Sequence, residues 1–170
     1  MSAYTLANWQ NFFAAEAGAA AALTGLIFVA ISINLTRIIG HPALPGRAGD
    51  ALCKLGAILV IATIGLVPGM AVTTTGVLIG ATGLVAWLGC MVPQIRLLRR
   101  RVPEWNWPTH RQWILHRLIV AQCATVPLMI AGVSLVLQRG GGLYWLLPGV
   151  IFSFVGGIIG AWILLVEILR

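Results

Sequence analysis

The sequence predicts an all-α membrane protein, a single domain of residues 1–170 with five transmembrane helices, and three observations lead to this fold class. Hydrophobic residues make up 59% of the chain and charged residues only 9%, whereas an ordinary soluble domain is about 25% charged. Long uncharged runs recur, and at about 1.5 Å of rise per residue each can form a helix that crosses a hydrocarbon core of about 30 Å. Lys and Arg residues gather between alternate runs. This composition cannot build a water-solvated surface.

The first span is predicted at about residues 12–36. Residues 17–36 are twenty in a row without a charge, with Glu16 before them and Arg37 after them. The first half of this run is almost all Ala and Gly, and such small residues suit a helix that lies close against other helices in a membrane.

The second and third spans share one uncharged run of forty-one residues, 55–95. A single helix of that length would measure about 62 Å, twice the hydrocarbon thickness, so the run must fold back on itself. Pro68 and Gly69 mark the turn. The spans are therefore predicted at about 51–68 and 73–95. We expect Lys54, inside the second span, to extend its side chain to the membrane interface.

The fourth and fifth spans follow a basic and aromatic segment at residues 96–113. The fourth is predicted at about 112–138, where twenty-one uncharged residues follow Arg117. The sequence RGGG at 139–142 predicts a tight turn, and the fifth span follows at about 143–166.

The distribution of Lys and Arg predicts the orientation. With the N-terminus outside, ten of the eleven Lys and Arg residues fall on the inner side and only Arg139 falls outside, as the positive-inside rule requires. We predict a multi-pass protein of a bacterial inner (plasma) membrane, N-terminus out and C-terminus in. Aromatic residues typical of an interface form a predicted outer belt of Trp9, Phe12, Phe13, Tyr144 and Trp145.

The basic run after the third span is expected to contact anionic lipid headgroups. Its members are Arg96, Arg99, Arg100 and Arg101. A cytoplasmic loop that fixes the topology accounts for the same residues, so nucleic acid is not an expected partner.

Polar residues are few in the first span, so each is a candidate for function. Glu16 and Asn34 are eighteen residues apart, five full helical turns, and share one face. The candidate pore-lining or polar-face set is Glu16, Thr24, Ser32 and Asn34. Three interpretations of Glu16 remain open: a solvated residue at the outer interface, a cation-attracting residue at a pore mouth, or a partner for another span. Ser32 and Asn34 have a second interpretation, hydrogen bonding between helices.

Glycines predict where helices lie close together. Gly18, Gly25 and Ser32 recur every seven residues and lie roughly opposite the face of Glu16. Pairs of glycines four residues apart are motifs for close helix contact, within one chain or between two copies. These pairs are Gly76 with Gly80 and Gly156 with Gly160.

No pattern of residues indicates an active site. The cysteines Cys53, Cys90 and Cys123 are interpreted as small buried hydrophobic residues. His110 and His116 lack a third ligand for a metal, and no phosphate-binding loop or nucleophile motif is present in the sequence. We therefore expect no catalytic residue, metal or cofactor, and a chain that is not an enzyme.

Three pieces of the sequence carry a resemblance to a known family: NWQNFFAAEAGAAAALTGLIFVAISINLTRI at 8–38, HPALPGRAG at 41–49 and FSFVGGIIGAWILLVEILR at 152–170. They resemble a family of small bacterial integral membrane proteins labelled modulator of FtsH protease. The resemblance implies association with a membrane-bound protease and supplies no motif residues that could be assigned to a site.

A shorter stretch, residues 22–31, is similar to the pore-lining first helix of Orai calcium channels in its small residues and its Val29-Ala30 pair. Those channels depend on an acidic residue about three positions past this pair. Ile33 stands there in this chain, so the resemblance does not imply calcium selectivity.

These observations favour a self-associating, non-enzymatic membrane protein with a regulatory or scaffolding role, for instance on a membrane protease. The alternative is a homo-oligomeric ion channel or pore lined by the first span. A membrane enzyme acting on lipid or quinone is a third class, disfavoured because no catalytic constellation is present.

Overall fold

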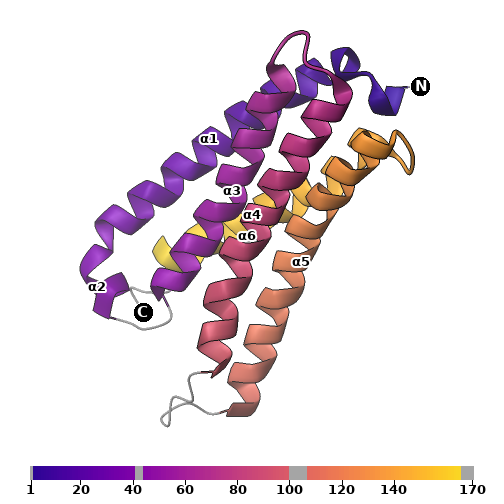
Figure 1. Cartoon of the computed structure of the whole chain (residues 1–170). Coiled ribbons are helices and arrows are strands. Elements are labelled where there is room, and N and C mark those ends of the chain that lie inside the picture. The colour runs from indigo at the N-terminus through magenta and orange to yellow at the C-terminus, as the bar shows by residue number, and fades with distance from the viewer. Residues whose placement is uncertain (1, 41–43, 100–106, 166–170) are drawn as a thin grey trace.

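The computed structural model describes residues 2–40, 44–99 and 107–165, and these residues form an all-α bundle (Figure 1). Five of the helices are long and apolar enough to cross a membrane, which confirms the predicted fold class. The α-helices are α1 (Gln10–Ile33), α2 (Leu35–Gly40), α3 (Leu44–Leu66), α4 (Val72–Arg99), α5 (Trp107–Leu137) and α6 (Leu146–Leu165). Short 3-10 turns precede α1, at Ser2–Tyr4 and Leu6–Trp9, and precede α6, at Gly142–Trp145.

Helix α3 occupies the centre of the bundle, in contact with α1, α4 and α6, while α5 packs against α4 and α6. The start of α1, the α3–α4 turn and the α5–α6 turn lie together at one end (Figure 1). Short α2, the start of α3 and the start of α5 lie at the other end (Figure 1). We call it the basic end because Arg47 lies near the start of α3 and Arg96 near the end of α4. Successive long helices therefore run in opposite directions, as five membrane passes require.

The second span starts earlier than predicted. We expected this span to begin at about residue 51, but α3 already begins at Leu44. Pro45 is tolerated because it lies in the first helical turn, where its missing N–H would have no intrahelical partner. Lys54 is therefore ten residues inside the helix.

The first span is interrupted before its predicted end at residue 36. α1 stops at Ile33, and Asn34 has a non-helical backbone (φ −110°, ψ 17°) before α2 begins at Leu35. The Asn34 side chain donates one hydrogen bond from Nδ2 to the Leu164 carbonyl at 2.8 Å. This bond ties the end of α1 to the end of α6.

The predicted aromatic belt is wrong for Trp9 and Phe13, the two members that are buried. Phe13 is 1% exposed and Trp9 is also buried, so both belong to the core rather than to an interface. Gly65 provides the space on α3, because a Cβ there would lie 2.5 Å from Cδ2 of Phe13. The exposed members are Tyr144 and Trp145, and the Trp9 ring meets the Tyr144 ring edge-on at 5.2 Å.

The N-terminal segment closes the same end of the bundle. Gly141 has a left-handed backbone (φ 109°) and its N–H donates a hydrogen bond to the Tyr4 hydroxyl at 3.1 Å. Beside it, Gly142 N–H donates to Ser134 Oγ at 2.8 Å. The predicted RGGG turn is therefore held by the beginning of the chain and by α5.

Candidate functional site

The charged residues of α3 form an ion pair inside the bundle. Asp50 and Lys54 are four residues apart, which places them one above the other on the same helix face. Lys54 Nζ lies 2.9 Å from Asp50 Oδ2, and the two side chains are 4% and 11% exposed. The expectation that Lys54 reaches the interface is therefore wrong, because its ammonium group pairs with a carboxylate within the protein instead.

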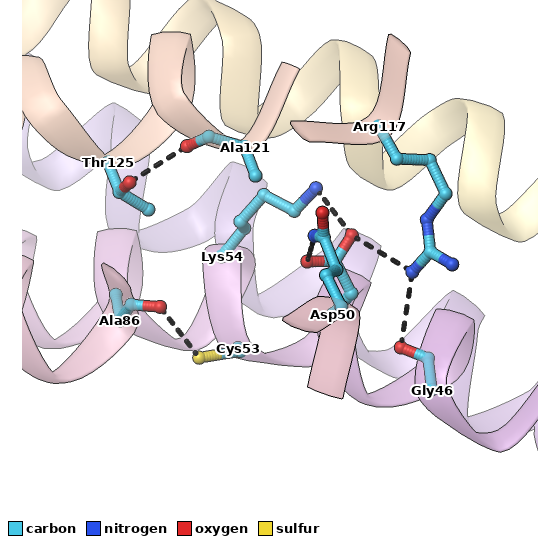
Figure 2. Close-up of polar contacts among 9 residues, drawn as sticks. Gly46, Asp50, Cys53, Lys54, Ala86, Arg117, Ala121 and Thr125 are labelled. Carbon is cyan, nitrogen blue, oxygen red and sulfur yellow. Dashed lines mark hydrogen bonds and ion pairs between the residues drawn. The ribbon is translucent and has the colours of Figure 1, made fainter. Parts of the chain in front are cut away.

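Two further helices approach the same carboxylate (Figure 2). From α5, Arg117 Nη2 lies 3.8 Å from Asp50 Oδ2 and 3.5 Å from the Gly46 carbonyl oxygen, to which it donates a hydrogen bond. From α4, Gln94 Nε2 donates to Asp50 Oδ1 at 3.4 Å, and Gln94 is itself buried. Asp50 thus gathers donors from α3, α4 and α5 around one pair of oxygens.

A pocket of about 190 Å³ opens beside this cluster between α3, α5 and α6. Its polar side chains come from α3 and α5, while α6 contributes glycines and isoleucines. The polar lining is Arg47, Asp50, Lys54, His116 and Arg117. The remaining lining is Ala51, Val120, Gly156, Ile159, Gly160 and Ile163. We call this the basic pocket.

Two thiols lie on the α4 side of the cluster. Cys53 Sγ donates a weak hydrogen bond to the Ala86 carbonyl at 3.7 Å, and Cys53 packs against the buried Cys90 (Figure 2 shows Cys53 and Ala86). The cysteines are free thiols. In the part of the chain that the structure describes, no three His, Cys, Asp or Glu side chains are grouped as a metal site would need.

The polar residues predicted on the first span do not form one site. Asn34 is buried against α6, whereas Ser32 is exposed and its hydroxyl donates to the Phe28 carbonyl of its own helix. The Thr24 hydroxyl likewise donates to the Ala20 carbonyl of the same helix. Glu16 is half-buried, and its Oε2 atom is buried without a hydrogen-bond partner among the described residues. Glu16 and Asn34 thus face the bundle while Ser32 faces outward.

The predicted packing glycines divide into two groups. A Cβ at Gly76 would lie 2.8 Å from Leu135 Cβ, and one at Gly80 would lie 3.6 Å from Gly132 Cα, so both glycines serve the contact between α4 and α5. Gly156 and Gly160 face α3 within the same chain. Gly18 and Gly25, in contrast, have no atom of the described structure within 4 Å of a Cβ position.

The arginines expected at lipid headgroups are only partly described. Arg96 is exposed near the end of α4, and Arg99 is the last residue of that helix. Arg100 and Arg101 lie outside the described residues.

Asp50 is the functional candidate that sequence reasoning missed. The sequence does contain a pattern that indicates it: an acidic residue stands four positions before a lysine, and an apolar run follows. Its contacts with Gln94 and Arg117 could not be read from spacing, because those residues come from other helices.

Comparison of this chain with protein-family models, with curated proteins and with solved structures found no match.

Proposed function

We propose that this chain is a non-enzymatic multi-pass membrane protein that works by association, with a second copy docked on the outward face of α1. One contrast carries the proposal. The glycines of α4 and α6 lie in contacts inside the chain, but a Cβ at Gly18 or Gly25 of α1 would meet no atom of the described residues within 4 Å. In the most apolar stretch of the first span, Leu6–Ile33, only 17% of the residues are buried inside the protein. The corresponding share is 33–44% in the other four spans.

The spacing of the small residues favours a second copy of the same chain as the occupant. Gly18, Gly25 and Ser32 recur every seven residues on the exposed face, and Ala15 and Ala22 are exposed beside them. In a membrane the hydrophobic effect does not drive helices together, so association depends on close van der Waals packing, which small residues permit. A two-fold dimer brings the same stripe from each copy into contact. The Ser32 hydroxyl already bonds its own helix, so pairing leaves no donor unsatisfied.

The regulatory or scaffolding role is part of the same proposal. The resemblance of residues 8–38 and 152–170 to FtsH modulators makes a membrane-bound protease the partner to test first. Such a partner would bind the assembled protein.

Native mass spectrometry in lipid nanodiscs tests the self-association. Gly25→Ile places a large side chain on the stripe and is expected to shift the population from dimer to monomer at least tenfold. Ala81→Ile is the matched control, since Ala81 is an exposed small residue on α4. A parent chain that is monomeric at all concentrations, or a Gly25→Ile dimer as stable as the control, would refute the proposal.

A homo-oligomeric pore lined by α1 is the second candidate, and Glu16 is the observation in its favour. A buried carboxylate oxygen without a partner in a membrane span is costly, and intramembrane acidic residues mark ion pathways. Asn34 does not support a pore, because its side chain bonds Leu164 instead. Cation flux into proteoliposomes that Glu16→Gln abolishes, from a ring of four or more copies, would support the pore; absence of flux would exclude it.

A further inference from the structure

The geometry points to a binding site for a phosphate group in the basic pocket, with Lys54 and Arg117 as donors. This inference is independent of the docking surface on α1, because the pocket lies between α3, α5 and α6.

Lys54 is the first residue of the pocket with donors that suit an anion. Its side chain is 4% exposed, its ammonium group carries three N–H donors, and its ion-pair partner among the described residues is Asp50. Leaving donors of a buried cation without partners costs free energy, unless an anion or water enters the pocket. The side chain lines the pocket, so an entering anion reaches the ammonium group directly.

The charges around Asp50 favour an anion as the occupant. The lining contains three basic side chains, Arg47, Lys54 and Arg117, and one carboxylate, Asp50. Asp50 Oδ2 lies 2.9 Å from Lys54 Nζ and 3.8 Å from Arg117 Nη2. A guanidinium group presents a planar fork of donors that matches phosphate oxygens, and a lysine adds a point charge to such a site. One phosphate can therefore bind both side chains.

The shape of the pocket also suits a phosphate attached to a larger molecule. Gly156 keeps the space beside the lysine open, because a Cβ there would lie 3.4 Å from Lys54 Nζ. The lining also includes the apolar side chains of Val120, Ile159 and Ile163, and Ile159 is exposed on α6. At the basic end of the bundle, a lipid phosphodiester and a soluble phosphomonoester would both present this chemistry.

Native mass spectrometry of the chain in detergent micelles can separate these two sources. The probes are phosphatidylglycerol, phosphatidylcholine and glycerol 3-phosphate, each titrated alone. Tighter binding of phosphatidylglycerol than of phosphatidylcholine, with no adduct of glycerol 3-phosphate, identifies the lipid as the source. Saturable binding of glycerol 3-phosphate identifies the soluble source. Failure of both anions to bind more tightly than phosphatidylcholine would overturn the inference.

Two variants connect the binding to the pocket. Gly156→Val narrows the space at Lys54 without changing a charge and is expected to weaken the anion's affinity at least tenfold. Gly56→Val is the matched control, because a Cβ at Gly56 meets nothing within 4 Å. Arg117→Gln removes one donor and is expected to weaken affinity by a similar factor. Contacts made by Arg96 and its neighbours contribute equally to parent and variants. Affinities unchanged in both pocket variants would overturn the inference.

Discussion

Lys54 Nζ and Asp50 Oδ2 are 2.9 Å apart on the same face of α3, and their side chains are 4% and 11% exposed. The pair lies where three helices meet, and its two charges depend on each other. A buried ion pair is costly to form but far more costly to break by removing one partner.

Asp50→Ala is expected to destabilise the protein by about 3–5 kcal/mol, because it leaves the Lys54 ammonium buried without its carboxylate. Thermal unfolding in detergent, followed by circular dichroism, measures the loss. The double variant Asp50→Ala with Lys54→Met removes both charges and is expected to recover most of the stability. Equal stability of the single and double variants would show that the pair is not the cause.

Asn34→Ala is expected to destabilise the protein by about 0.6–1.7 kcal/mol, the range for interhelical hydrogen bonds in membranes. The variant removes the bond from Asn34 Nδ2 to the Leu164 carbonyl, which joins α1 to α6. Ser32→Ala is the control, since that hydroxyl is exposed and bonds only its own helix among the described contacts. Reversible unfolding in mixed micelles compares the two, and a larger effect at Ser32 would contradict the assignment.

Phe13→Ala is expected to cost about 3–5 kcal/mol, because Phe13 is 1% exposed and fills the space left by Gly65. Phe28→Ala on the same helix is the control, with Phe28 57% exposed toward the predicted lipid. Chemical unfolding of the two variants in the same detergent gives the comparison. Similar losses would mean that α1 does not pack as the structure has it.

Gly76→Ala is expected to destabilise the α4–α5 contact by about 1–3 kcal/mol through overpacking. The new Cβ would lie 2.9 Å from the Gly132 carbonyl oxygen as well as near Leu135. Gly56→Ala has open space around its Cβ and is expected to stabilise the helix by about 0.5–1 kcal/mol. Both variants replace glycine by alanine, but Gly76→Ala is expected to lower the melting temperature and Gly56→Ala to raise it. Comparing the two melting temperatures with that of the parent protein therefore tests the prediction.

The five spans could be predicted because the length of an uncharged run and the rise of a helix together fix how often a chain can cross a bilayer. The start of α3 could not, since Pro45 and Gly46 resemble a loop until the first turn of the helix is seen to accept them. A proline in a sequence indicates that a helix boundary is near. It does not show whether the helix ends before the proline or begins there.

The candidate site was less predictable, because it depends on which helix faces meet. The pairing of Asp50 with Lys54 is local and follows from helical spacing. The approach of Gln94 and Arg117 depends on how α4 and α5 pack beside α3. In a membrane protein, residues that face lipid and residues that face protein have the same hydrophobicity, so the packing faces cannot be read from one sequence.

The hydrogen bond between Gly141 N–H and the Tyr4 hydroxyl joins the segment before α1 to the α5–α6 turn. A ribosome makes Tyr4 well before the α5–α6 turn, because Gly141 follows it by 137 residues. Tyr4 therefore cannot form this contact until the four long helices α1, α3, α4 and α5 have been made. Closure of this end of the bundle is a late event in biogenesis, and a chain truncated before residue 141 lacks it.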